Sequence, residues 1–320
     1  MRDTFFKTIG EIANHNDDIF ILTGDLGFKL FDDFKTRYPE RFYDVGVAES
    51  NMAGIAAGLA LSGKNVYCYS IIPFLIMRAY EHIRVDIAYQ NLNVKLVGVG
   101  GGFTYGLEGF THYGLEDLAL MRSLPNMTVI VPADKIEARC VAELSYKHQG
   151  PVYIRLGRTG EAVIHETSPA FDIGKAICLR YGSEVALFAI GNMVHTGIIV
   201  ADLLSREGLK ATLINMHTIK PLDTEIIFQV ASNHKYIFTL EEHNVHGGLG
   251  SCVAEVLSEV NFNGNFKRFG IPSNLENYIG SADYLRNKYG LTPECIYNEI
   301  MKILERSIDT SSVKKREKGG

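Results

Sequence analysis

Residues 43–60 read Tyr43-Asp-Val-Gly-Val-Ala-Glu-Ser-Asn-Met-Ala-Gly-Ile-Ala-Ala-Gly-Leu-Ala60, and this stretch decides the fold. Its first part, Tyr43 to Ala48, is rich in apolar residues and predicts a buried strand. Its second part consists of small residues and predicts a helix, with Ser50 or Asn51 placed to cap its start. Glu49 stands at the junction. A carboxylate is costly to bury without a partner, so Glu49 is either a functional group or an acid that interacts favourably with the helix dipole.

The composition is that of a soluble globular protein. The chain has 320 residues, 46% hydrophobic and 22% charged, and a net charge of −5, which does not suggest a nucleic-acid-binding surface. Five cysteines lie far apart, and none has the CxxC spacing of a metal site. The N-terminus has no signal-peptide pattern, and no apolar run reaches the ~18 residues of a membrane span. We therefore expect a cytoplasmic protein with free thiols.

Strand-like and helix-like segments alternate along the whole chain, which predicts an α/β fold with two open, mainly parallel sheets. A region at 161–182 has glycine and proline without periodicity, which is typical of a linker. We therefore expect one domain at 1–160 and a second at 183–308. Residues 309–320 are polar and basic and predict a disordered tail. The predicted strands are residues 19–23, 43–48, 65–69, 94–99, 127–131 and 152–155 in the first domain, and 185–190, 211–215 and 236–240 in the second.

Candidate chemical groups follow several of the predicted strands. In open parallel sheets ligands bind outside the carboxyl ends of the strands, and Asp25, Glu49 and Phe74 stand at such ends. The loop Gly106-Leu-Glu-Gly-Phe-Thr-His-Tyr-Gly114 adds Glu108 and His112. Each of these could be an ordinary solvated residue, but an acid and an imidazole beside a glycine-lined cleft suit proton transfer.

The glycine-rich turns do not indicate a nucleotide site. Gly100-Gly-Gly102 and Gly247-Gly-Leu-Gly250 match neither the Walker A spacing nor the GxGxxG spacing. The sequence also lacks the GxSxG nucleophile elbow, the HExxH zinc motif and the kinase signatures. These reaction classes are therefore disfavoured.

Four separated motifs follow the segment from Gly46 to Ala60 along the chain: Phe74-Leu-Ile-Met-Arg-Ala-Tyr80, Gly109-Phe-Thr-His112, Leu124-Pro-Asn-Met127 and Val131-Pro-Ala-Asp134. Taken together and in this order, these stretches resemble the pyrimidine-binding domain of the transketolase family of thiamine-diphosphate enzymes. The region from about 183 to 307 resembles the family's C-terminal domain through Ile219-Lys-Pro-Leu-Asp223 and Glu241-Glu-His-Asn-Val-His-Gly-Gly-Leu-Gly250.

The resemblance also implies a missing half. Full-length members carry a preceding domain whose Gly-Asp-Gly motif and a later Asn hold the diphosphate through Mg²⁺, and Gly24-Asp-Leu-Gly27 is not such a motif. We therefore expect the C-terminal subunit of a split transketolase, inactive alone. It would need a separate subunit that holds the diphosphate and most of the Mg²⁺ contacts, and we expect no metal ligand set in this chain. Two copies of each subunit would form a heterotetramer.

For the cofactor, the resemblance assigns Glu49 to the glutamate beside N1′ of the aminopyrimidine, where a carboxyl group can share a proton with the ring. The cofactor would then carry the carbanion chemistry. Phe74 matches the aromatic residue that packs on this ring. Tyr80 lies further along the same wall, and Asp25 approaches from the first loop. Met77 stands where many relatives have another aromatic residue.

For the substrate, the resemblance assigns His112 to the histidine near the donor carbonyl, as a second catalytic residue. Glu108 falls where the family often has an aspartate that contacts a substrate hydroxyl. Arg158 matches an arginine that pairs with a substrate phosphate. The expected reaction is transfer of a two-carbon ketol unit from a ketose, as its phosphate, to an aldose.

Two related reactions remain as alternatives. The β subunits of 2-oxoacid dehydrogenases share the fold and the glutamate, but the residues from Gly106 to His112 together with Arg158 favour the sugar reaction. A 1-deoxyxylulose-phosphate synthase is less favoured because that enzyme is one longer chain. A non-enzymatic assembly subunit is disfavoured because Glu49, Phe74 and His112 are all present.

Overall fold

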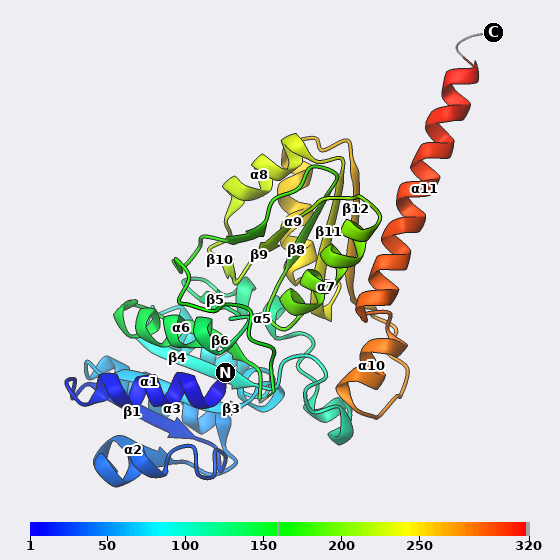
Figure 1. Cartoon of the computed structure of the whole chain (residues 1–320). Helices are drawn as coiled ribbons and strands as arrows, with labels where there is room; N and C mark the ends of the chain where they lie inside the picture. The colour runs from blue at the N-terminus through cyan, green and yellow to red at the C-terminus, as the bar shows by residue number, and fades with distance from the viewer. Residues whose placement is uncertain (159, 318–320) are drawn as a thin grey trace.

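The fold is described here from a computed structural model, which describes residues 1–158 and 160–317. In this part of the chain, two separate sheets form the framework, as the sequence predicts (Figure 1). The first sheet has the strand order β10 (Thr218–Lys220), β5 (Thr128–Ile130), β6 (Val152–Leu156), β4 (Val94–Val99), β3 (Asn65–Ile71), β1 (Ile19–Thr23) and β2 (Phe42–Asp44).

All neighbouring strands of the first sheet are parallel except β10, which runs antiparallel to β5. The second sheet is likewise parallel apart from the antiparallel edge strand β7. Its strand order is β12 (Asn265–Ile271), β11 (Tyr236–Asn244), β8 (Val185–Ala189), β9 (Ala211–Asn215) and β7 (Ile177–Arg180). The α/β, mainly parallel architecture predicted from the alternating pattern is confirmed.

The helices form layers on both sides of each sheet (Figure 1). One face of the first sheet packs against α1 (Arg2–Ala13), α2 (Asp32–Arg37) and α6 (Lys135–Lys147). Its other face packs against α3 (Glu49–Leu61) and α5 (Asp117–Ser123), and the same apolar core continues into the second sheet with α8 (Thr224–Asn233) and α9 (Leu249–Glu259). The far face of the second sheet is covered by α7 (Met193–Arg206) and α11 (Pro293–Glu317), and α10 (Ala282–Lys288) joins the same apolar cluster beside the loop that follows β4.

The predicted buried strand at 43–48 is wrong in extent and in burial. Strand β2 covers only Phe42–Asp44 and lies at the edge of the sheet, where Tyr43 is 44% exposed. Asp44 ends the strand because its Oδ1 accepts hydrogen bonds from the backbone N–H groups of Asp25 and Gly46. Gly46 then turns the chain with a φ of +72°. An edge strand buries only part of its surface, which an apolar run alone does not reveal.

After Pro73, apolar residues at positions 76, 80, 83 and 87 have helical spacing and predict an α-helix. The segment is helical, but it is not a regular α-helix. It consists of a π-helical segment at Pro73–Met77, a short α-helical turn, α4 (Tyr80–His82), and a second π-helical segment at Ile83–Ala88. The apolar residues Ile76, Ile83 and Ile87 are buried in the core as the helical stripe predicts. The wider π-turns change which side chains lie together at the start of this segment.

The connection between the two halves is more structured than its composition suggests. The whole of strand β7 lies inside the stretch predicted as a linker, residues 161–182. Strand β10 comes from the second half of the sequence but pairs with β5 in the first sheet. Helix α11 continues to Glu317, through most of the stretch predicted as a disordered tail, and residues 318–320 lie outside the described residues.

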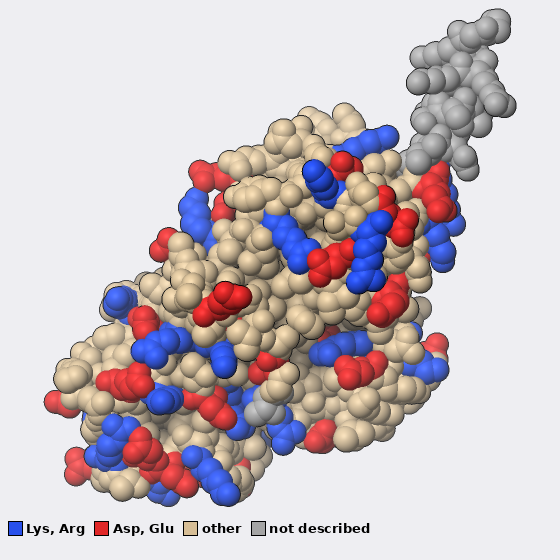
Figure 2. Space-filling view, viewed as in Figure 1, with Lys and Arg blue, Asp and Glu red and all other residues tan. Residues whose placement is uncertain are grey.

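The surface carries both signs of charge. On the face shown in Figure 2, basic and acidic side chains intermingle over both halves of the molecule. Within the described ranges, no helix has the length and apolarity needed to cross a bilayer.

Acid should destabilise the protein through His217. This residue is fully buried, and its ring stacks on that of Phe171 with the two ring centres 3.8 Å apart. Burial, with a smaller contribution from His165, lowers the pKa of His217 to about 3. The unfolded chain therefore binds a proton below pH 6.5 that the folded chain rejects, so stability is complete above this pH and is lost on acidification. We expect a loss of about 2 kcal/mol at pH 5 from this residue.

Urea unfolding between pH 7.5 and pH 5 measures this effect. His217→Gln should flatten the pH dependence, and the same change at the exposed His15 should leave it unchanged. An equally steep pH dependence in His217→Gln would show that the acid sensitivity arises elsewhere.

Candidate active site

The carboxyl ends of the parallel strands bring the predicted functional segments to one edge of the first sheet. The Gly24–Asp25 loop follows β1, Phe74 follows β3, and Arg158 follows β6. The loop that contains Glu108 and His112 follows β4. This is the edge at which open α/β sheets bind ligands.

Glu49 lies in the first turn of α3 and is only 1% exposed. Its Oε1 accepts a hydrogen bond from Ser70 Oγ at 3.1 Å, and its Oε2 accepts one from Arg78 Nη1 at 2.9 Å. Glu49 therefore has polar partners within the fold. They matter because burying a carboxylate without partners would cost several kcal/mol. The predicted cap is wrong: the residue before the helix is Ala48, and Ser50 Oγ instead donates to the Arg78 carbonyl.

The backbone of the first loop lies directly against this carboxylate. A Cβ at Gly24 would lie 3.3 Å from the Gly46 carbonyl oxygen and 3.4 Å from Glu49 Oε1. This spacing is tight for a side chain, which explains the glycine. Asp25 follows with a positive φ of 55°, and its side chain is exposed.

Arg78 and the Phe74 ring together connect Glu49 to the glycine-rich loop that contains His112. The Arg78 guanidinium carbon lies 5.3 Å from the centre of this ring, a cation–π distance. The His112 ring meets Phe74 edge-on at 5.0 Å with an interplanar angle of 76°. Glu49, Phe74 and His112, which are distant in sequence, therefore form one contiguous group with Arg78.

Tyr105 extends this group towards Arg158. Its ring centre lies 6.2 Å from that of His112 and 5.3 Å from the guanidinium carbon of Arg158. Burial raises the pKa of Tyr105, while the cations Arg158 and Arg2 oppose the shift. His112 Nδ1 also lies 3.0 Å from the hydroxyl of its neighbour Thr111. The edge thus presents a buried carboxylate at one end and an arginine at the other.

Two predicted site residues do not contact this group in the structure. The Tyr80 hydroxyl contacts Ser123 Oγ at 2.9 Å and donates to the Leu120 carbonyl, so it faces α5 rather than Glu49. Glu108 lies on the exposed side of a short 3-10 turn (Gly106–Glu108). Among the described residues, neither forms a hydrogen bond, an ion pair or a ring contact with Glu49, Phe74 or His112.

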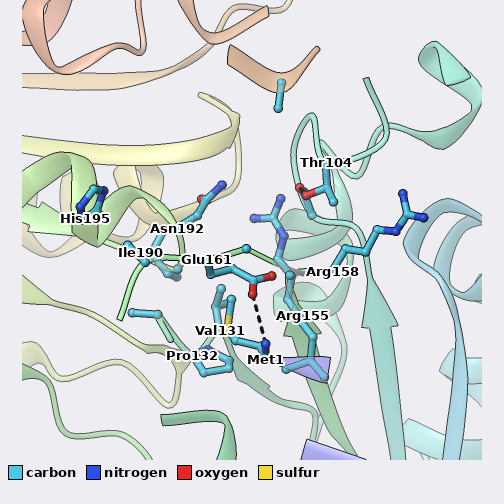
Figure 3. A pocket seen from close by; sticks show the side chains of 18 of the residues that line it. Met1, Thr104, Val131, Pro132, Arg155, Arg158, Glu161, Ile190, Asn192 and His195 are labelled. Carbon is cyan, nitrogen blue, oxygen red and sulfur yellow. Dashed lines mark hydrogen bonds and ion pairs between the residues drawn. The ribbon is translucent and has the colours of Figure 1, made fainter. Parts of the chain in front are cut away.

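A cavity of about 420 Å³ lies beside this edge, between the two halves of the chain (Figure 3). Arg158 and Thr104 come from the first half, and Asn192 and His195 from the start of α7. Figure 3 also shows the ion pair between the Met1 ammonium and Glu161 Oε2, at 3.1 Å. The two halves therefore contribute to a shared hollow next to Arg158.

The loop that carries His112 is anchored by Glu242, a residue that sequence reasoning missed. Glu242 is 1% exposed, and its Oε1 accepts a hydrogen bond from the Phe103 N–H at 2.8 Å. Its Oε2 accepts bonds from Asn192 and from Arg286 Nη2, the latter at 2.8 Å. One carboxylate thus ties the start of the loop to α7 and α10.

Ser70 and Arg78 were also missed. The signal for Arg78 was its position four residues after Phe74, but the partner of a cation cannot be read from one helix. Among residues 1–158 and 160–317, no group of three or more histidine, cysteine or acidic side chains is arranged to hold a metal ion.

Comparison with known families gives the class of protein. Residues 1–160 match the transketolase pyrimidine-binding domain, and residues 174–296 match the transketolase C-terminal domain. The chain therefore belongs to the transketolase family.

One relative that matches from end to end is described as a subunit. The chain is 38% identical over 307 residues to the 6-deoxy-6-sulfo-D-fructose transketolase subunit SqwH of Clostridium sp. (strain MSTE9), covering 96% of this chain and 95% of that protein. It is 33% identical to a 1-deoxy-D-xylulose-5-phosphate synthase of Pelotomaculum thermopropionicum, but covers only 47% of that protein.

A solved structure described as "split gene transketolase, inactive beta4 tetramer" superposes with a TM-score of 0.86 at 36% identity, covering 94% of this chain and 97% of that one. The prediction of a split-transketolase subunit is confirmed by these matches, and the synthase alternative is not favoured.

Proposed function

We propose that this chain, with a partner subunit, transfers a two-carbon ketol unit from a ketose to an aldose. Glu49 carries the proposal. It is a buried carboxylate at the edge formed by the carboxyl ends of the strands. One of its oxygens accepts a hydrogen bond from Ser70, and the other accepts one from the planar guanidinium of Arg78. Such a site suits an aminopyrimidine ring, which is also planar and presents nitrogen donors.

The residues present fit thiamine diphosphate at its pyrimidine end. Glu49 would hold the ring nitrogen and share a proton with it, and Phe74 would pack on the ring, with Asp25 as a further proposed contact. Tyr80 is not included, because its hydroxyl faces α5. When bound, the cofactor supplies the carbanion chemistry that splits a bond next to a carbonyl. The protein's part is to orient the ring, to hold the proton at Glu49 Oε2 and to exclude water.

The remaining residues of the edge suit a sugar. His112 would act on the donor near its carbonyl, and Glu108 would accept a hydrogen bond from a substrate hydroxyl. Arg158 offers a forked cation for an anionic end group such as a phosphate. The relative SqwH is named for a sulfo sugar, which also ends in an anion, so we include sulfonates among the possible end groups.

We propose a separate partner subunit that holds the diphosphate and Mg²⁺, and an assembly of two copies of each subunit. The end-to-end matches to transketolase subunits support this proposal. All five cysteines are free, which suits the reducing cytoplasm. The test is ketol transfer from a ketose phosphate to an aldose phosphate with the chain, the partner, thiamine diphosphate and Mg²⁺. We expect turnover only with both subunits, and turnover by the pure chain would refute the split.

Arg158→Met should raise the KM for an aldose phosphate about tenfold to a hundredfold with little change in kcat, because a charge-assisted hydrogen bond to the end group is lost. Steady-state kinetics of the reconstituted pair measure this effect. An unphosphorylated aldose should show no such change. The control is Arg139→Met, since Arg139 is 55% exposed on α6. An unaltered KM for the phosphate would remove Arg158 from the substrate site.

A further inference from the structure

Arg78 contacts two residues of the candidate site, Glu49 and Phe74. Its Nη1 donates to Glu49 Oε2 at 2.9 Å, and its guanidinium carbon lies 5.3 Å from the centre of the Phe74 ring. Under the proposed function, these are the carboxylate oxygen and the aromatic ring that receive the aminopyrimidine. A guanidinium is planar and presents N–H donors, so it resembles that ring in shape and in hydrogen bonding.

The two oxygens of Glu49 are held from different sides. Ser70 is fully buried and holds Oε1 from inside the fold. The Arg78 side chain is 46% exposed and holds Oε2 from the solvent side, while the carboxylate between them is 1% exposed. A ligand that reaches Oε2 from solvent therefore meets Arg78 first.

We propose that Arg78 is a placeholder, which pairs with Glu49 while the cofactor is absent and is displaced from Oε2 when the aminopyrimidine binds. This inference rests on the proposed function. Two planar groups cannot both lie between Glu49 Oε2 and Phe74. Displacement is feasible because the Arg78 side chain is 46% exposed and can move into solvent, while the aminopyrimidine replaces it as the partner of the buried carboxylate.

The placeholder has two consequences. In the cofactor-free protein, Arg78 keeps a buried carboxylate paired, so its loss should lower stability. During cofactor binding, Arg78 competes for Oε2, so its loss should increase affinity. A residue that stays in contact with the bound cofactor would have the opposite effect on affinity. The two roles can therefore be distinguished by one binding measurement.

The experiment is calorimetric titration of thiamine diphosphate, with Mg²⁺, into the reconstituted pair, together with melting of the cofactor-free protein. Arg78→Met should bind the cofactor about fivefold more tightly and should melt at a lower temperature without it. Arg78→Lys should restore both values towards wild type, because it keeps the cation. Arg84→Met changes an exposed arginine on the next π-helical segment and is the matched control.

A double mutant tests the mechanism. In a Glu49→Gln background the charge pair is absent, so Arg78→Met should no longer tighten binding. Weaker or unchanged binding in Arg78→Met overturns the placeholder but leaves the proposed function intact. Absence of thiamine diphosphate binding in the wild-type pair would overturn both. Should Arg78→Met not fold, Arg78→Gln removes the charge while keeping a planar amide, and the same increase in affinity is expected.

Discussion

Replacing Glu49 with glutamine should abolish exchange of the thiamine C2 proton in the reconstituted pair, with a loss of about 10³-fold or more. Glutamine has nearly the same shape and can keep the hydrogen bond from Ser70 to its amide oxygen. It cannot share a proton with the ring nitrogen. The loss of exchange therefore measures the contribution of the shared proton and not that of side-chain packing. Rapid-quench deuterium exchange followed by NMR measures the rate.

The matched control for this change is Glu81→Gln, because Glu81 lies on α4 with a side chain that is 76% exposed. It should exchange at the wild-type rate. Size-exclusion chromatography should find both variants assembled with the partner. An exchange rate in Glu49→Gln within a few fold of wild type would reduce Glu49 to an acid at the start of a helix.

Removing Glu242 should have the largest effect on stability. Glu242→Ala should lower the free energy of unfolding by about 3 kcal/mol, because it leaves the Phe103 N–H and the Arg286 guanidinium without their buried partner. Because Glu242 anchors the start of the loop that carries His112, ketol transfer should also fall. Urea unfolding monitored by circular dichroism measures the stability.

Asp283→Ala is the control for this change, since Asp283 is the other acidic partner of Arg286 and its side chain is 92% exposed. An exposed pair contributes little, so its loss should cost less than about 0.5 kcal/mol. Equal losses of stability in the two variants would show that the effect comes from the charge of Arg286, and not from the buried hydrogen bonds that Glu242 accepts.

Much of the fold could be predicted because it is encoded locally. Apolar runs bounded by turn residues indicated strands such as β1 and β4, and these were found with the predicted bounds. The same reasoning failed at β2, because an edge strand and a central strand have similar sequences. It also missed β10, whose pairing with β5 joins residues about 90 positions apart.

The candidate site could likewise be predicted only in part. Parallel topology places Glu49, Phe74 and His112 at one sheet edge, so their proximity could be inferred from order and type of residue. The contacts of Arg78 and Glu242 could not. Each depends on which side chains meet across distant segments, and for Arg78 also on π-helical turns that a regular helical pattern does not predict. Single-sequence patterns contain no information on such pairings.

The most direct test of the central claim is C2 proton exchange of thiamine diphosphate with each subunit alone and with the two combined. If this chain supplies the proton-sharing carboxylate and the partner supplies the diphosphate site, fast exchange should require both subunits and an intact Glu49. Exchange at the same fast rate with the partner alone, or with the pair carrying Glu49→Gln, would contradict this account.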